Sequence, residues 1–242
     1  MPRSRRTMRI VKVKNYEQLS QMATDIIAGR IRQKQDLVLG LSAGSTPILT
    51  YQLLAQEHQQ TGLDFSKTKT FNLDEYYGLS PTHSQSYRYF MEKHFFSKIN
   101  LKKENIHFLN GLIKNPSKEC QKYEQEIKKA GGVDLQILGI GHNGHIGFNE
   151  PGSSFNSKTR VVKLDRQTII TNSRNFKAAE RIPQKALTIG IQTIMSAKEI
   201  ILLAGKNKKR IISKVLKSEI TSDIPATVLK KHPNCTIIVE MN

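Results

Sequence analysis

Residues 37–47 read LVLGLSAGSTP, and this stretch decides the fold class. Residues 37–41 form a short apolar run, which is typical of a strand buried on both faces of a parallel sheet. Small polar residues follow, and Pro47 then begins a helix, because its fixed φ suits a first helical turn. A buried strand that leads through a short turn into a helix is the repeating unit of α/β folds.

The same order recurs along the chain on both sides of this stretch. We predict strands at residues 9–13, 37–41, 69–73, 135–140, 199–204 and 236–239. We predict helices after Asn15, after Pro47, around 87–94, from 115 to 131 and at about 207–216. Segment 159–188 has no clear period. The pattern predicts one domain over residues 1–242, with 1–8 as a loose basic tail. Its fold is a doubly wound, mainly parallel, Rossmann-like α/β sheet with helices on both faces.

Composition argues for a globular chain inside the cell. Apolar residues make up 38% of the 242 residues, and no apolar run approaches the roughly 20 residues that span a bilayer. The basic N-terminus is not followed by an apolar stretch typical of a signal peptide. Cys120 and Cys235 both lie in segments with apolar periodicity, so we expect buried free thiols. The expected location is cytoplasmic, with no membrane partner.

The formal net charge of +18 has two interpretations. Six basic residues and no acid fall within the first fourteen positions, which leaves room for a nucleic-acid binder. The other lysines are scattered over expected helix faces, without aromatic RNA-binding motifs among them. We therefore favour a solvated basic surface with no obligatory nucleic-acid partner. Such a charge can still speed the capture of an anionic substrate.

Ligands of parallel α/β sheets bind beyond the carboxyl ends of the strands, and the polar segments of this chain follow predicted strands. The first such segment follows the strand at 37–41. Its candidate phosphate-binding residues are Ser42, Ala43, Gly44, Ser45 and Thr46. Free amides at a helix start and nearby hydroxyls suit a phosphate group. A plain strand-to-helix turn has a similar composition, and the segment matches neither the P-loop nor the dinucleotide fingerprint.

The second segment is TFNLDEYYGL, residues 70–79. Asp74 and Glu75 stand where an apolar strand ends, beside aromatic side chains. Partial burial would raise the pKa of such a carboxyl group toward that of a useful general base. Taken alone, the segment is more typical of a solvated acidic turn.

The third segment is GIGHNGHIGFNEPGSS, residues 139–154, and it is much more specific. Its glycines indicate a tight loop that directs polar groups into a pocket. His145 has Asn143 and Glu150 nearby in sequence as orienting partners, an arrangement typical of acid–base sites. A lone loop histidine is more often structural. We expect no metal at His142 and His145, because Glu150 is the only nearby acid.

Two later cations are candidates for binding an anion. Arg174 lies among small polar residues in TNSRNF, and Lys208 follows a predicted strand and begins a helix. The alternative for each is an ordinary surface charge.

Together these motifs resemble the glucosamine-6-phosphate deaminase family, also called glucosamine-6-phosphate isomerase, over most of the chain. The resemblance implies conversion of glucosamine 6-phosphate and water to fructose 6-phosphate and ammonia, a hydrolytic deamination in amino sugar catabolism. It implies that Asp74 moves a proton between C2 and C1, and that His145 opens the sugar ring. Glu150 and Asn143 would orient that histidine. No cofactor or metal is implied.

The resemblance also implies which residues hold the substrate's phosphate group: the loop at 42–46, Arg174 and Lys208. Three positions depart from the family pattern. Asn143 replaces a frequent aspartate, so it can orient His145 but cannot stabilise the imidazolium by charge. Ala43 replaces a common threonine and removes one hydroxyl. Val162 stands where allosteric relatives carry a lysine of the effector site, and the sequence ends at Asn242 without their C-terminal extension. We therefore expect a monomer without allosteric control.

Two other functions remain open at this point. A 6-phosphogluconolactonase resembles this family in fold and in its glycine–histidine loop, but Asp74 and Glu150 favour the deaminase. A sugar-phosphate-binding regulator would have kept the pocket without catalysis. Turnover would exclude the regulator, and ammonia release against lactone hydrolysis separates the two enzymes.

Overall fold

A seven-stranded sheet forms the centre of the molecule. The computed structural model describes residues 8–173, 176 and 182–241. In spatial order the strands are β1 (Arg9–Val13), β10 (Cys235–Glu240), β9 (Glu199–Ala204), β6 (Leu135–Leu138), β2 (Val38–Leu41), β3 (Lys69–Asn72) and β5 (Ile106–His107). All neighbouring pairs in this sheet are parallel. The predicted parallel α/β sheet is therefore confirmed.

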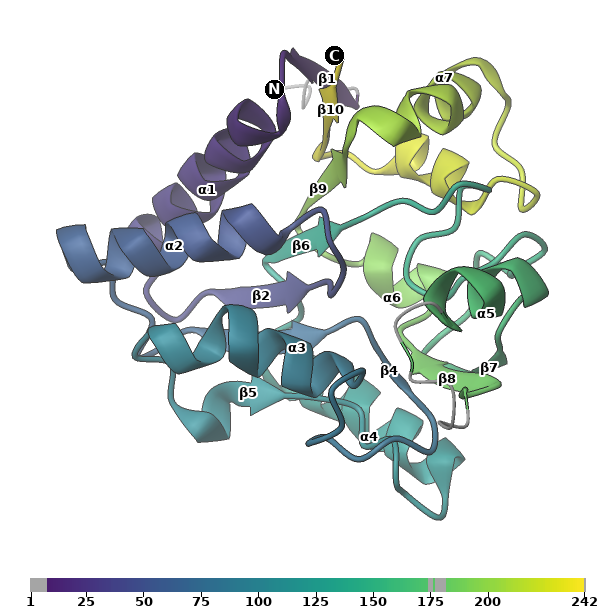
Figure 1. Cartoon of the computed structure of the whole chain (residues 1–242), viewed down its shortest axis with the longest axis horizontal. Helices are drawn as coiled ribbons and strands as arrows, with labels where there is room; N and C mark the ends of the chain where they lie inside the picture. The colour runs from purple at the N-terminus through teal and green to yellow at the C-terminus, as the bar shows by residue number, and fades with distance from the viewer. Residues whose placement is uncertain (1–7, 174–175, 177–181, 242) are drawn as a thin grey trace, which may run out of the picture.

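Helices cover both faces of this sheet (Figure 1). One face packs against α1 (Tyr16–Gln33), α2 (Ile48–Thr61) and α3 (Tyr87–His94). The other packs against α4 (Pro116–Lys129), α6 (Ile191–Met195) and α7 (Lys209–Lys217). Each face has its own apolar core, because side chains alternate between the two faces along every strand. The fold is doubly wound, as predicted.

Helix ends follow the expected capping chemistry. The side chain of Asn15 accepts a hydrogen bond from the Gln18 amide at 2.9 Å, and the Gln18 side chain accepts one from the Lys14 amide at 2.9 Å. These two bonds satisfy amides that the first turn of α1 leaves unpaired. Asn115 caps α4 in the same way, and Gly131 ends it with a φ of 88°. The caps were predictable because they depend on local sequence.

The sheet has a topological switch point between β2 and β6. From β2 the chain proceeds outward through β3 to β5, and it then returns to β6 on the other side of β2 before β9 and β10. In open parallel sheets, ligands bind at such a point, beyond the carboxyl ends of the strands. The strands β9, β6, β2 and β3 are adjacent in the sheet. The loops that follow them therefore lie side by side at the carboxyl edge of the sheet.

A second, antiparallel sheet was not predicted. It consists of β4 (Asp74–Tyr76), β8 (Lys185–Thr188) and β7 (Arg160–Lys163), in that order. Its strands are short and carry charged side chains, so their sequences show no clear period of two. Tyr76, Tyr87 and Phe148 belong to a small apolar cluster against this sheet, beside α5 (Arg166–Ser173).

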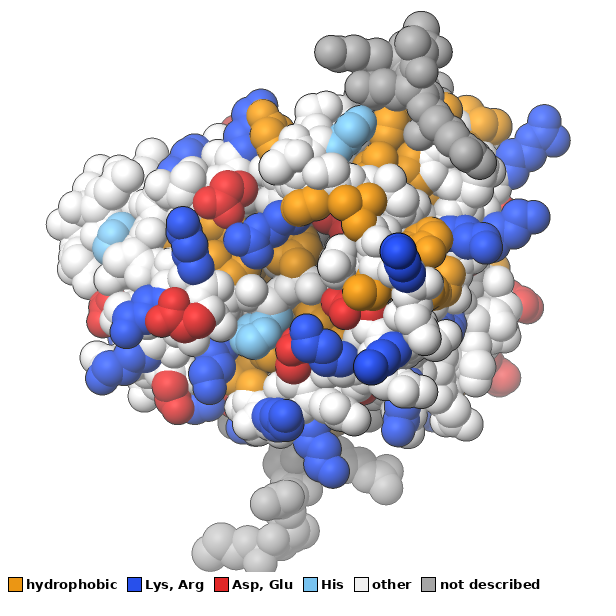
Figure 2. Space-filling model, turned by 90° about the horizontal axis from the view of Figure 1, so that it is seen from below, with side chains coloured by type: hydrophobic (Ala, Val, Ile, Leu, Met, Phe, Trp, Pro, Cys, Tyr) orange, Lys and Arg blue, Asp and Glu red, His pale blue; other side chains and the backbone are white. Residues whose placement is uncertain are grey.

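The remaining elements are short 3₁₀ helices: η1 (Phe96–Lys98), η2 (Lys103–Asn105), η3 (Lys206–Lys208) and η4 (Pro225–Lys231). The basic helix predicted at about 207–216 is thus divided into η3 and α7. Both cysteines are buried free thiols, as predicted. Within the described ranges, no helix combines the length and apolar character needed to cross a bilayer. Figure 2 shows basic side chains scattered over the visible face, with acidic side chains between them.

Candidate active site

The loops singled out in the sequence meet at one edge of the parallel sheet. Residues 42–47 follow β2, Asp74 lies just beyond β3, residues 139–150 follow β6, and Lys208 follows β9. These four strands are neighbours in the sheet, in the order β9, β6, β2, β3. Residues distant in sequence therefore come together at the switch point.

Asp74 is a buried carboxyl group that faces the loop after β6. A Cβ atom placed on Gly147 would lie 3.4 Å from Oδ2 of Asp74 and 3.1 Å from the hydroxyl of Thr188. Only 8% of Asp74 is exposed. Burial, with a smaller contribution from the neighbouring charge of Glu75, raises the pKa of Asp74 to about 8. The alternative interpretation as a solvated acidic turn is therefore wrong.

His145, Glu150 and Asn143 form a compact hydrogen-bonded group. Nδ1 of His145 lies 3.1 Å from Oε2 of Glu150, and the Asn143 side-chain amide donates to the same oxygen at 2.7 Å. The Asn143 side-chain oxygen in turn accepts from the main-chain amide of His145 at 3.2 Å. The three residues that the sequence associated are thus in direct contact.

The carboxylate of Glu150 has hydrogen-bond partners on both oxygens. Its Oε1 accepts from the hydroxyl of Thr168 on α5 at 2.7 Å. Burial alone would raise the pKa of Glu150, but hydrogen bonds from His145, Thr168 and Asn143 and the charge of His145 outweigh it and lower the pKa to about 2. Glu150 is therefore ionised throughout the physiological range, and it favours the His145 tautomer that carries its proton on Nδ1. The other ring nitrogen, Nε2, is then free to exchange a proton with a ligand.

The loop conformation depends on glycine at two positions beside these side chains. A Cβ atom on Gly141 would come within 2.3 Å of the His145 ring, so the imidazole packs directly on the backbone there. Gly147 has a φ of 57° and lies against Asp74. The loop thus carries His145 and also forms part of the wall around Asp74.

The loop at 42–46 partly matches the prediction. Gly44 has a φ of 128°, and Ser45 and Thr46 are accessible, but the hydroxyl of Ser42 is buried. The first amides of α2 are not all free, which differs from our expectation. The Ile48 amide lies 3.4 Å from the Ser45 carbonyl, and the Leu49 amide donates to the hydroxyl of Tyr16. A phosphate at this place would depend on the loop itself more than on the helix start.

Lys208 lies close to the loop after β6. It is half-buried, and burial lowers its pKa. Burial and then the charges of Lys208 and His145 lower the pKa of His142, which places these three groups within electrostatic range of one another. Arg174 and its predicted phosphate contact lie outside the described residues.

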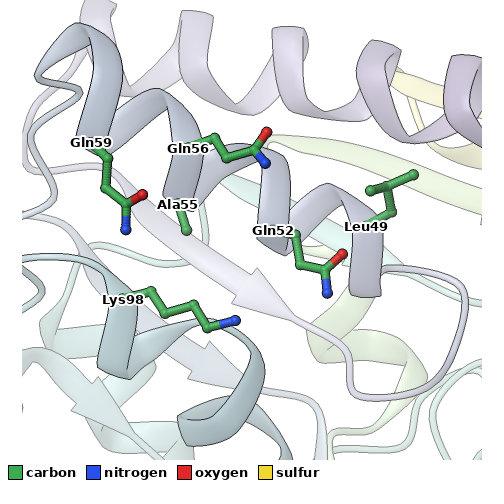
Figure 3. Close-up of a pocket in the computed structure, with 6 residues that line it drawn as sticks. All are labelled: Leu49, Gln52, Ala55, Gln56, Gln59 and Lys98. Atoms are coloured by element: carbon green, nitrogen blue, oxygen red, sulfur yellow. The ribbon is translucent and has the colours of Figure 1, made fainter.

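Two hollows in the described part of the chain are not lined by Asp74. One has a volume of about 370 Å³ and lies between α2 and Lys98, where it is lined mainly by glutamine side chains (Figure 3). It has no acid–base pair. The other, of about 380 Å³, is lined by His142, Asn207, Arg210, Ile211 and Lys214 and adjoins the loop after β6. In the described part of the chain, no three His, Cys, Asp or Glu side chains are grouped to bind a metal.

Sequence reasoning missed two residues around the site. Thr168 bonds to Glu150 from a segment whose pattern is unclear, and Tyr16 bonds to the loop at 42–46 from the start of α1. Nothing local in the sequence indicates these two contacts. Glu75 was named beside Asp74, and it is almost completely buried.

The chain is similar to known proteins over nearly its whole length. The chain is 53% identical over 234 residues to a glucosamine-6-phosphate deaminase of Thermoanaerobacter pseudethanolicus, covering 96% of this chain and 92% of the relative. It is 53% identical over 218 residues to glucosamine-6-phosphate deaminase 1 of Giardia intestinalis, covering 89% and 82%. A solved monomeric glucosamine-6-phosphate deaminase superimposes with a TM-score of 0.94 at 44% identity, covering 96% and 97%.

A 6-phosphogluconolactonase from Trypanosoma cruzi shares the fold, with a TM-score of 0.77, but only 20% identity over 97% of this chain and 95% of its own. The model of the family described as glucosamine-6-phosphate isomerases/6-phosphogluconolactonase matches residues 12–238. The chain therefore belongs to the glucosamine-6-phosphate isomerase/6-phosphogluconolactonase family, and within it is similar to the deaminases.

Proposed function

We propose that this protein is a glucosamine-6-phosphate deaminase that converts D-glucosamine 6-phosphate and water to D-fructose 6-phosphate and ammonia. One observation carries the proposal: the loop after β6 brings both groups together. The buried carboxyl of Asp74 lies against this loop at Gly147, and the loop itself carries the His145–Glu150 pair, with the His145 ring packed on Gly141. An aldose-to-ketose isomerisation needs one base over two adjacent carbons and a second proton donor at the ring oxygen. The site contains one group of each kind.

His145 acts first, because the pyranose ring must open before C2 can be deprotonated. With Glu150 ionised and bonded to Nδ1, the Nε2 atom exchanges a proton at the ring oxygen. Asn143 hydrogen-bonds to both the Glu150 carboxylate and the main-chain amide of His145, and so fixes their relative positions. The roles of Asn143 and Glu150 are thus orientation and electrostatic support.

Asp74 then takes the proton from C2 and delivers it to C1. The carboxylate must be ionised to do so, and its raised pKa makes it a stronger base than an exposed aspartate. Loss of the C2 proton, with protonation of the aldehyde oxygen from water, gives an enolamine, and return of the proton from Asp74 to C1 converts this enolamine to an imine at C2. Water adds to that imine and ammonia leaves, so the overall reaction is a hydrolytic deamination.

The substrate's phosphate group lies at the loop 42–46 with Lys208, whose partial burial suits an anionic partner. Arg174 is proposed as a further phosphate ligand on the basis of its sequence motif. The reaction requires no cofactor or metal, because every proton transfer has a protein group available for it.

We also infer a cytoplasmic enzyme of amino sugar catabolism that acts as a monomer without allosteric control and without a nucleic-acid partner. The similar deaminase of known structure is described as monomeric. Val162 on β7 supplies no charge for an anionic effector. Two buried free thiols suit a reducing compartment.

A coupled assay of the purified protein tests the proposed function. Glucosamine 6-phosphate should yield ammonia and fructose 6-phosphate in equal amounts, and 6-phosphogluconolactone should not be hydrolysed above its spontaneous rate. Lactone hydrolysis without ammonia release would instead establish the lactonase. No turnover of either compound, together with retained sugar-phosphate binding, would indicate a binding protein.

A further inference from the structure

Glu75 is a buried carboxyl group whose two oxygens each accept two hydrogen bonds. Oε1 accepts from the amides of Tyr76 at 2.8 Å and Tyr87 at 3.0 Å. Oε2 accepts from the hydroxyl of Ser86 at 2.7 Å and the amide of Arg88 at 2.9 Å. Only 3% of the residue is exposed. This number of donors is unusual for a group with no assigned role.

The hydrogen-bond geometry favours the ionised form of Glu75. Three of the four donors are main-chain amides, which can only donate, so a protonated carboxyl would lose at least one bond. Burial raises the pKa of Glu75 above its usual value, and the bonds from Arg88, Ser86, Tyr87 and Tyr76 limit that rise. With every lone-pair position near a donor, the ionised form is the one that the surroundings fit.

Among the described residues, no guanidinium pairs with this carboxylate. Arg88 contributes only its main-chain amide to Glu75, because its side chain reaches Glu92 at 3.6 Å and lies 5.3 Å from the centre of the Phe108 ring. The compensation comes from amide dipoles at the start of α3. Such dipoles stabilise an anion without neutralising its field at a neighbouring group.

Asp74 is the group next to this anion. The phenols of Tyr87 on α3 and Tyr123 on α4 lie within electrostatic range of Asp74, and burial raises the pKa of both well above the ordinary range. Towards the loop after β6, Asp74 faces Gly147, with the His145–Glu150 pair beyond it. On the neighbouring strands, Thr188 is neutral and pairs with Asp74 in register. Glu75 is therefore the charged group next to Asp74 in the chain, and its charge acts on Asp74 through space.

We propose that Glu75 is a positioning residue for the general base: it fastens β4 to the start of α3 and, as a fixed anion, opposes a second negative charge at Asp74. Asp74 consequently holds strongly the proton that it removes from C2. This inference rests on the proposed function, because it assigns Asp74 the role of base. Glu75 itself does not touch the substrate.

The test is the pH profile of kcat/KM for ammonia release from glucosamine 6-phosphate. In Glu75→Gln the charge is removed with little change in shape. The acid limb should move to lower pH by about one unit, because ionised Asp74 is no longer repelled. The plateau of kcat should fall about tenfold, because the base is weaker. Glu119→Gln removes another buried carboxylate, which accepts from the Asn110 amide, and it should leave the profile unchanged.

Two further variants separate charge from anchoring. Glu75→Asp keeps the charge but shortens the side chain, so kcat should fall while the acid limb stays in place. Ser86→Ala removes one donor and the cap of α3, so the protein should unfold at a lower temperature without a shift of the acid limb.

An unchanged acid limb in Glu75→Gln would overturn the proposal. The proposal would also fail if the acid limb of Glu75→Asp moved to lower pH as far as that expected for Glu75→Gln. If Glu75→Gln does not fold, the Glu75→Asp profile alone decides between these outcomes. If the unmodified protein releases no ammonia, the proposed function fails, which is a distinct result. If the unmodified protein releases ammonia and the acid limb of Glu75→Gln does not shift, only the role of Glu75 is contradicted.

Discussion

At the scale of single residues, the site depends on a carboxyl group kept where water scarcely reaches it. Asp74→Asn preserves the shape of the side chain but removes the base. We expect turnover to fall by about a hundredfold or more, as is usual when a general base is lost. Binding of glucosamine 6-phosphate should persist in calorimetric titration. Retained turnover in this variant would show that another group moves the proton.

The same substitution should stabilise the protein. The folded-state pKa of Asp74 is raised to about 8, so between about pH 4 and 8 the folded chain holds a proton that the unfolded chain releases. Stability is therefore lost as pH rises through this window. Asparagine has no such titration, so Asp74→Asn should unfold less readily by about 1–3 kcal/mol at pH 8, with a smaller gain at pH 5. Denaturant unfolding at both pH values measures this, and a gain independent of pH would contradict it.

Asn143 distinguishes this chain from relatives with aspartate at the same place. Its side-chain amide donates to Glu150 Oε2 at 2.7 Å, so Asn143→Asp would put two carboxyl groups within hydrogen-bond distance. One of them must then hold a proton, and the pKa of the pair rises. Stability relative to the unmodified protein should therefore fall between pH 5 and pH 8, by about 1 kcal/mol. Thermal unfolding in matched buffers tests the sign, and greater stability at the higher pH would contradict it.

At the scale of elements, the loop after β6 serves both halves of the site. Gly147→Ala adds a Cβ atom 3.1 Å from the Thr188 hydroxyl and 3.4 Å from Asp74, at a φ of 57°. Gly152 is a matched control, because its φ is 85° but open space surrounds it. Both alanine variants should lose about 1 kcal/mol of stability through backbone strain. Only Gly147→Ala should also have a lower kcat. If kcat fell equally in both variants, the contact between Gly147 and Asp74 could not be the cause.

The sequence predicted elements well where one period dominated. Apolar runs mark β2, β6 and β9, and Asn15 and Asn115 mark their helices through local caps. The two-residue strand β5 is too short to show a period, and it was not predicted. The antiparallel sheet escaped prediction because β4 and β7 are short and carry charges, and their pairing with β8 joins distant parts of the chain. Long-range pairing leaves no local periodicity.

The candidate site also has a part that was predictable from local sequence and a part that depends on long-range contacts. His145, Asn143 and Glu150 lie within one loop, so spacing alone brought them together. Thr168 reaches Glu150 from α5, and Glu75 is held by the start of α3, contacts that only the fold creates. The burial that raises the pKa of Asp74 also comes from packing of several elements, which explains why the isolated segment read as an acidic turn.

At the scale of the whole molecule, we expect simple kinetics. The proposed monomer has no second copy through which sites could communicate, and Val162 offers no cation to an effector phosphate. Initial rates should follow a hyperbola in substrate concentration, and N-acetylglucosamine 6-phosphate should not change its shape. Light scattering should give the mass of one chain, 27.5 kDa. A sigmoidal curve that the effector makes hyperbolic, or a hexamer in solution, would contradict this expectation.

The two edge strands of the parallel sheet, β5 and β1, are poor partners for a strand of another chain. At one margin β5 is only two residues long, and at the other β1 presents the exposed charges of Arg9 and Lys12. A foreign strand that added to either margin would find few free amides or would have to bury a cation. Concentrated solutions should accordingly resist fibril-like association through the sheet, and this protection comes from the outermost strands, not from the candidate active site.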